Sequence, residues 1–286
     1  MKNLKSNLIL LTIATIVAIQ FNACKKDCTN EKCRDNLTTK EVPITGKIKG
    51  VIIEGPWDVT ITQDSSNNSA VLEYCSRGEI SAKLLSNGYL QIKISSLGNL
   101  YHNHGFRATI KAAALEKIEA DGATKIRTYG HFCSLNDISL SGASSINGLS
   151  SEGFDLNIEL CGASDLKSFT FSGNSMNTKL SDASEMHFSS IDLDYCTVNL
   201  SGASVFSGGG YADKSVFTGS DASDFKTLNL VSETLDINLS GVSVAAVTVN
   251  NNIKGRLTDA STLKYKGDAN VSGVSLSGES RIIKLD

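Results

Sequence analysis

A four-residue motif recurs about every 20 residues between residues 121 and 280. Its first position is usually Ser, its second is Gly or Asp, its third is usually Ala, and its fourth is Ser or Thr. The copies begin at Asp121, Ser141, Cys161, Ser181, Ser201, Ser220, Ser240, Thr258 and Ser277. A fixed period in this range is typical of solenoids, in which stacked units bury the apolar faces of their neighbours.

Apolar residues flank each copy at alternate positions. Around the copy at Ser141, for example, Ile138 and Leu140 precede the motif and Ile146 follows it. Alternation with a period of two is typical of strands that bury one face. The sequence therefore predicts an all-β chain, folded as a parallel β-helix (β-solenoid) with coils of about 20 residues. Neighbouring strands lie about 4.8 Å apart, so the stacked coils would form a rod on the order of 40 Å long.

The second motif position indicates the shape of each corner. It is occupied by Gly122, Gly142, Gly162, Asp182, Gly202, Asp221, Gly241, Asp259 and Gly278. Gly adopts positive φ freely, and Asp is one of the few other residues that tolerate it. We therefore expect a left-handed backbone at every corner. From Gly162 onward Gly and Asp alternate, which places like charges on every second coil and reduces their repulsion.

The N-terminal segment has the features of a targeting signal. Lys2 and Lys5 precede a short apolar stretch, Leu8 to Ile19, and Ala23-Cys24 follows. This order resembles a bacterial lipoprotein signal, in which the cysteine is lipidated after cleavage; the alternative is an ordinary secretory signal. We predict a signal peptide over residues 1–23, a lipid on Cys24 and a polar tether over residues 24–46, followed by one domain over residues 47–286.

The chain has 7 cysteines. Lipidation of Cys24 would leave six in an oxidising compartment, where disulfides are common. The other cysteines are Cys28, Cys33, Cys75, Cys133, Cys161 and Cys196. Cys28 and Cys33 are close enough in sequence to pair, whereas the last four are compatible with disulfides or with buried free thiols. No Cys-x-x-Cys spacing is present, so the sequence predicts no metal site and no cofactor.

The segment before the repeats reads Val51-Ile52-Ile53-Glu54-Gly55-Pro56-Trp57-Asp58-Val59-Thr60-Ile61-Thr62-Gln63. Asn87-Gly88-Tyr89-Leu90-Gln91-Ile92 follows. Together with the repeated Ser-Gly-Ala-Ser, this order resembles the "putative auto-transporter adhesin, head GIN domain" family of Gram-negative envelope proteins, over residues 47–286. The resemblance implies a right-handed β-helix and an adhesin role, and it implies no catalytic residues.

Two groups of residues are candidates for ligand contact. Asp182, Asp221 and Asp259 recur on every second coil. Carboxylates at such a separation suit an inverting glycoside hydrolase, but the corner geometry alone also explains them. Trp57, the only Trp, is either a binding platform or a cap on the open end of the core. His102 and His104 lie in a polar stretch that favours an exposed loop over a metal site.

The composition indicates little about the partners of this chain. The net charge is -3, and the sequence has neither a basic stripe nor an aromatic-rich face, so we expect no nucleic-acid partner. No group of catalytic residues stands out, and we expect a non-enzymatic, lipid-anchored envelope protein that binds glycan or protein through one face of the β-helix. The expected location is the outer membrane, on its periplasmic or its outer side. The alternatives are a polysaccharide-degrading enzyme and a purely structural envelope component.

Overall fold

The computed structural model describes residues 37–75, 79–96 and 105–286. These residues form strands joined by turns, and they contain no helix that could span a membrane. Cys24, Cys28, Cys33, His102 and His104 lie outside the described residues, so the predictions about them stay predictions.

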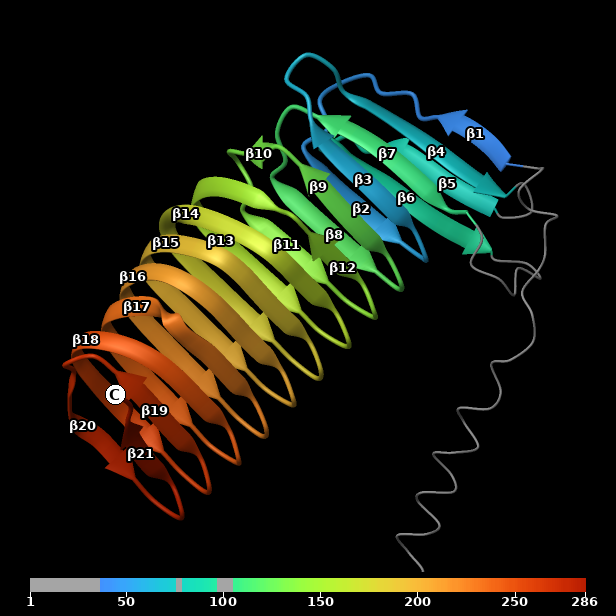
Figure 1. Ribbon diagram of the computed structural model, residues 1–286. Coiled ribbons are helices and arrows are strands. Elements are labelled where there is room, and N and C mark those ends of the chain that lie inside the picture. The colour runs from blue at the N-terminus through green and yellow to red at the C-terminus, as the bar shows by residue number, and fades with distance from the viewer. Residues whose placement is uncertain (1–36, 76–78, 97–104) are drawn as a thin grey trace, which may run out of the picture. The chain divides into compact units, whose positions relative to one another are not determined.

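The strands wind into a solenoid of about 8 turns, with parallel pairing between segments about 20 residues apart (Figure 1). The predicted all-β solenoid is confirmed. One side of the coils is built from β2 (Gly50–Glu54), β8 (Lys117–Asp121), β11 (Asp137–Leu140) and β20 (Asn270–Leu276). The other side of the corners is built from β3 (Asp58–Gln63), β9 (Lys125–Tyr129), β12 (Ser145–Asn147), β19 (Thr262–Lys266) and β21 (Arg281–Lys284).

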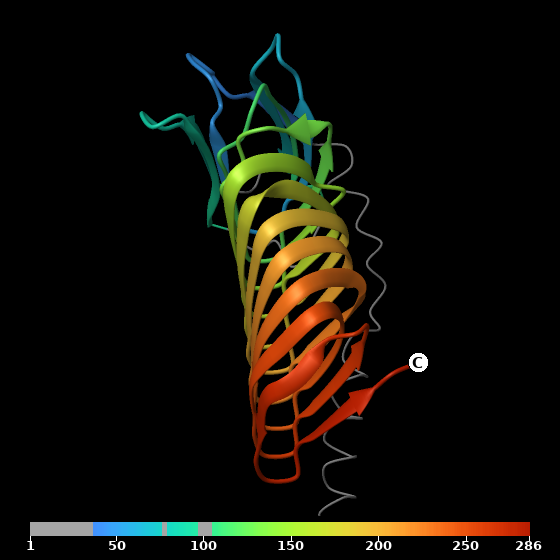
Figure 2. The same cartoon turned by 90° about the vertical axis from the view of Figure 1, so that its left-hand side faces the viewer.

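Between these short strands, single long strands run round each coil from one corner to the next (Figure 2). They are β13 (Ser150–Leu160), β14 (Asp165–Leu180), β15 (Glu185–Leu200), β16 (Val205–Gly219), β17 (Asp224–Leu239) and β18 (Val244–Leu257). A two-residue strand, β10 (His131–Phe132), pairs with the start of β13.

The register brings equivalent residues of successive coils into contact. Leu140 pairs with Leu160, Leu160 with Leu180, and Leu180 with Leu200, and all four are buried. A shift of one residue would turn every such side chain to the outside, so the alternation fixes the register. Aromatic rings also pack across a corner: Phe217 precedes the corner at Ser220 and Phe225 follows it, and their ring centroids lie 4.8 Å apart.

The N-terminal end of the solenoid is closed by antiparallel strands. β1 (Leu37–Glu41) pairs with β4 (Ser69–Cys75), β4 pairs with β7 (Arg107–Ala112), and β5 (Glu79–Leu84) pairs with β6 (Tyr89–Ser96). β6 and β7 pair in parallel with β2 and β3, which in turn pair with β8 and β9. The segment that follows β3 in sequence therefore covers the coil that contains β3.

This arrangement corrects the predicted tether. Residues 37–46 were expected in the tether of residues 24–46, but residues 37–41 form β1 and Val42 is buried. The reason is that β4 has an edge to be covered, and Leu37–Glu41 pairs with it.

The C-terminal end of the solenoid is less covered than the N-terminal end. Among the described strands, β20 pairs only with β18 and β21 pairs only with β19, and Leu276 stays half exposed.

Candidate functional site

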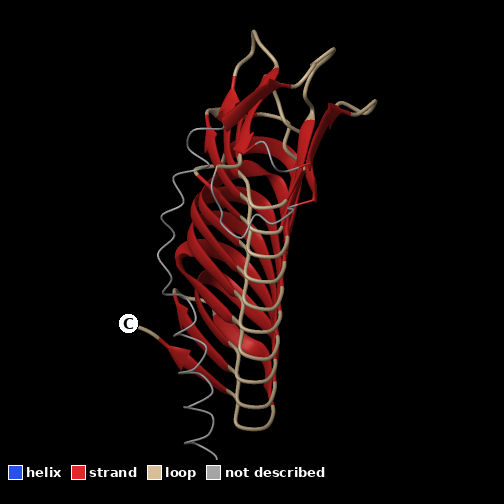
Figure 3. Ribbon diagram, turned by 90° about the vertical axis from the view of Figure 1, so that its right-hand side faces the viewer, coloured by secondary structure: helices blue, strands red, loops and turns tan. Residues whose placement is uncertain are grey.

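The predicted corners stack in one column along an edge of the solenoid (Figure 3). The left-handed backbone expected there is present at the second motif position of every copy. Among the glycines, φ is 89° at Gly122, 71° at Gly142, 75° at Gly162, 70° at Gly202, 69° at Gly241 and 70° at Gly278. Asp182 and Asp221 have φ of 62°, and Asp259 has φ of 59°. These residue types are therefore explained by backbone geometry.

The three corner carboxylates each contact the preceding coil. Asp182 Oδ2 accepts a hydrogen bond from the Gly162 N–H at 3.1 Å, and Asp221 Oδ2 accepts one from the Gly202 N–H at 3.2 Å. Asp259 Oδ2 accepts one from the Gly241 N–H at 3.0 Å. The Gly202 N–H and the Ser220 hydroxyl lower the pKa of Asp221. Each carboxylate thus caps a glycine N–H of the column, which is a structural role.

The fourth corner position faces the core. In most coils its buried hydroxyl donates to two carbonyl oxygens, as Ser204 Oγ does to Ser201 O at 2.9 Å and to Leu180 O at 3.4 Å. There are two exceptions: Ser164 Oγ donates only to Leu140 O, at 3.3 Å, and the buried hydroxyl of Ser223 has no hydrogen-bond partner. These hydroxyls are therefore not exposed to an external ligand.

Trp57 occupies this same inward position one coil earlier. Glu54 pairs with Asp121 and Asp58 with Lys125, so Trp57 is equivalent to Thr124. Trp57 is 1% exposed. Its ring packs edge-on against Phe106, with the ring centroids 5.4 Å apart, and its Nε1 donates a hydrogen bond to Glu54 O at 3.2 Å. The ring offers no face to a ligand, so the interpretation of Trp57 as a binding platform is wrong and it belongs to the core.

Three of the cysteines in the described residues are free thiols. Cys133 is exposed, Cys161 is half-buried and Cys196 is buried. Burial raises the pKa of the Cys196 thiol to about 12, so this thiol is unreactive in the folded protein. The side chain of Cys75 lies outside the described residues.

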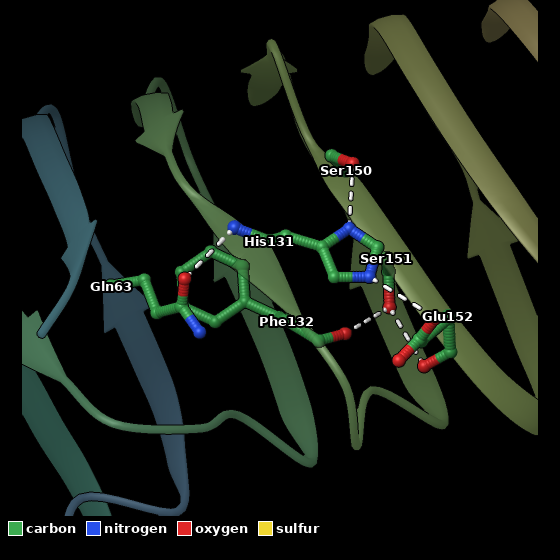
Figure 4. A network of polar contacts seen from close by, with 6 residues as sticks. All are labelled: Gln63, His131, Phe132, Ser150, Ser151 and Glu152. Carbon is green, nitrogen blue, oxygen red and sulfur yellow. Dashed lines mark hydrogen bonds and ion pairs between the residues drawn. The ribbon is translucent and has the colours of Figure 1, made fainter. Parts of the chain in front are cut away.

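A polar network lies where β10 meets β13 (Figure 4). His131 Nδ1 lies 2.9 Å from Ser150 Oγ, and His131 Nε2 lies 3.5 Å from Glu152 Oε2. The backbone N–H of His131 donates to Gln63 Oε1 at 3.1 Å, and Ser151 Oγ donates to Phe132 O at 2.6 Å. A hydrogen bond with Glu152 raises the pKa of the nearby Cys133 thiol.

A model of the "putative auto-transporter adhesin, head GIN domain" family matches residues 48–269. The chain belongs to this family. No curated protein sequence matches it. The family resemblance seen in the sequence is thereby confirmed.

Several solved structures have a similar fold. A putative adhesin from Parabacteroides merdae is 13% identical, with a TM-score of 0.63, over 88% of this chain and 97% of that chain. A putative adhesin from Parabacteroides distasonis is 13% identical, with a TM-score of 0.60, over 87% of this chain and 97% of that chain. A putative lipid binding protein from the same organism is 15% identical, with a TM-score of 0.59, over 88% of this chain and 97% of that chain. At these identities the likeness shows the fold.

The network at β10 was not predicted from the sequence, although one signal for it exists. His131 and Cys133 are separated by one residue, which on a continuous strand would place them on the same side, although β10 ends at Phe132 and Cys133 lies in the turn that follows. Glu152 lies about one coil further on, which brings it beside them. Cys-x-x-Cys spacing indicates ligands that are close in sequence, whereas these residues are divided between two coils.

Proposed function

We propose that this family member is a non-enzymatic outer-membrane lipoprotein that binds glycan through one exposed sheet of its solenoid. A lipid on Cys24 would hold it at the membrane. The observation that carries the proposal is an exposed tyrosine on a sheet face whose outward residues include several amides and hydroxyls. Membership of a putative adhesin family and the lipoprotein-like N-terminus support it.

The face is built from β14, β15, β16 and β17. On β15, Tyr195, Thr197 and Asn199 point outward, because they alternate with the buried Cys196 and Val198. Tyr195 is 53% exposed. We define the Tyr195 face as the outward residues of this region that carry uncharged polar groups, namely Ser175, Asn177, Tyr195, Thr197, Asn199, Thr218, Thr234 and Asn238.

The chemistry of this face suits a glycan. Amides and hydroxyls both donate and accept hydrogen bonds, as sugar hydroxyls do. A tyrosine ring adds an apolar surface with a polar edge, against which the carbon face of a sugar can pack. Asn177 pairs with Thr197, and Asn199 pairs with Thr218, so polar groups repeat at the strand spacing of about 4.8 Å.

The corner carboxylates do not support the alternative of a polysaccharide hydrolase. Asp182, Asp221 and Asp259 each have a left-handed backbone and accept a glycine N–H, which accounts for their presence. No other observation at these residues favours catalysis, so the binding function is the better supported of the two.

A glycan array with the full mature chain tests the proposal. We expect saturable binding to a limited set of glycans, reduced at least tenfold by Tyr195→Ala. The matched control is Tyr129→Ala, because Tyr129 is 56% exposed on β9, on the other side of the corners. Equal loss in both variants, or binding to proteins alone, would refute the Tyr195 face, and turnover of a polysaccharide would refute the non-enzymatic role.

The lipid anchor has a separate test. Cells expressing the full chain are labelled with an alkyne fatty acid, and membrane and soluble fractions are compared for the native chain and for Cys24→Ser. We expect lipid incorporation and membrane recovery only with Cys24. Unchanged labelling of Cys24→Ser would refute the anchor without bearing on glycan binding.

A further inference from the structure

Three potential metal ligands converge on the surface of the first coils. His131 pairs with Ser150 and Phe132 with Ser151, so Cys133 and Glu152 each follow a paired residue on adjacent strands. Phe132 and Ser151 point inward, and His131, Cys133 and Glu152 point outward. One ligand atom from each of the three lies within 4.8 Å of those of the other two.

The spacing is close to that of a tetrahedral zinc site. Zinc binds nitrogen and oxygen at about 2.0–2.2 Å and sulfur at about 2.3 Å, so two ligand atoms on one tetrahedral ion lie roughly 3.4–3.7 Å apart. His131 Nε2 and Glu152 Oε2 are already 3.5 Å apart. The Cys133 sulfur lies within 4.8 Å of a ligand atom of each of the other two residues, and zinc binding would require it to move closer to them.

The imidazole is also held in a suitable orientation. His131 Nδ1 lies 2.9 Å from Ser150 Oγ, so in the tautomer that carries its proton on Nδ1 this proton is donated to the hydroxyl, and Nε2, 3.5 Å from Glu152 Oε2, is left to bind a metal. Metal-bound histidines are typically fixed in this way, by a hydrogen bond from the second ring nitrogen to an oxygen. Figure 4 shows this outer partner, Ser150, together with two of the three ligands, His131 and Glu152.

We propose that His131, Cys133 and Glu152 bind a zinc ion that leaves a fourth coordination position open to water. A nitrogen, a sulfur and a carboxylate oxygen form a donor set typical of zinc, and three protein ligands with one open position are the pattern of accessible zinc sites. The proposal departs from the sequence analysis, which predicts no metal. It is independent of the Tyr195 face, which lies on later strands.

A second histidine serves as a control. His187 Nδ1 lies 2.9 Å from Ser207 Oγ, the same contact that His131 makes with Ser150. His187 belongs to no group of three potential ligands among the described residues. A histidine that only makes a surface hydrogen bond would behave like His187, so the pair separates a metal site from a structural contact.

The test measures zinc binding and thiol protection in the full chain. Cobalt is titrated first, because a thiolate ligand gives a sulfur-to-cobalt charge-transfer band. Alkylation of each cysteine is then followed by peptide mass spectrometry with and without zinc. We expect a band that zinc abolishes, and at least tenfold slower alkylation of Cys133 with zinc, while the rate at Cys161, outside the cluster, is unchanged.

Single substitutions distinguish a zinc site from a surface hydrogen bond. Cys133→Ser, Glu152→Gln and His131→Asn should each weaken zinc binding at least tenfold, whereas His187→Asn should not change it. Zinc binding that is unchanged by Cys133→Ser would come from another site and would overturn the proposal. So would unprotected alkylation of Cys133, or a disulfide at Cys133 in the isolated native protein.

Discussion

The carboxylate of Asp221 accepts a hydrogen bond from the backbone N–H of Gly202, 3.2 Å away on the preceding coil. Asp182 and Gly162 are related in the same way, as are Asp259 and Gly241. The alternation of Gly and Asp therefore has a second physical reason besides charge separation: each Asp satisfies a glycine N–H on the coil before it.

Because these hydrogen bonds favour the ionised carboxylate, we expect the stability of the folded protein to depend on pH. The hydrogen bonds from Gly202 and Ser220 lower the pKa of Asp221, and those from Gly241 and Thr258 lower the pKa of Asp259. A lowered folded-state pKa gives stability that is present above the unfolded value, near 3.8, and is lost as the pH falls through the folded value.

We therefore expect the melting temperature of the native chain to fall more steeply below about pH 4 than that of the double variant Asp221→Asn, Asp259→Asn. Thermal unfolding followed by circular dichroism across this pH range measures the difference. Parallel curves for the two proteins would show that these carboxylates do not contribute to acid unfolding.

Substitution of a corner glycine tests the backbone geometry. A Cβ at Gly202 would lie 2.6 Å from Asp182 O, and φ is +70° there. We expect Gly202→Ala to destabilise the protein by at least about 2 kcal/mol in chemical unfolding. Gly46→Ala is the control, because its Cβ would meet only Leu84 Cδ2 at 4.0 Å, and it should change stability little.

The same glycine tests the charge argument. Gly202 lies between Asp182 and Asp221 on neighbouring coils. Gly202→Asp should be less stable than Gly202→Asn at low salt, and the gap should narrow at high salt, because salt screens repulsion between exposed carboxylates. A gap that is insensitive to salt would mean that charge does not explain the alternation.

The inward serines differ in their hydrogen bonds, which allows a matched comparison. Ser204 and Ser223 are both buried at the fourth corner position, but only the Ser204 hydroxyl has partners. Ser204→Ala should cost about 1 kcal/mol in chemical unfolding, whereas Ser223→Ala should be neutral or stabilising. Equal effects of the two substitutions would contradict a stabilising role for the hydroxyls.

The single tryptophan reports on the end of the core. Because Trp57 is 1% exposed, we expect blue-shifted emission that shifts to the red on unfolding. Trp57→Ser would place a serine where the later coils have one, but it would leave a cavity against Phe106 and cost about 3–5 kcal/mol. Emission typical of a solvated indole in the folded protein would contradict the buried position.

The sequence by itself determines the repeating part of this protein. Restricted φ at Gly and Asp predicts the corners, and alternation around Leu140 and Leu160 predicts the strands and their register, because a slip of one residue would expose the core. These are local properties, repeated in every coil.

The tertiary structure alone decides what breaks the repeat. The antiparallel pairing of β1 with β4 depends on which edge is left uncovered, and the inward position of Trp57 depends on the register of β3 with β9. The proximity of His131 to Glu152 depends on how far the chain runs round one coil before it returns. Such relationships join residues that are distant in sequence, and no local pattern specifies them until the coils are stacked.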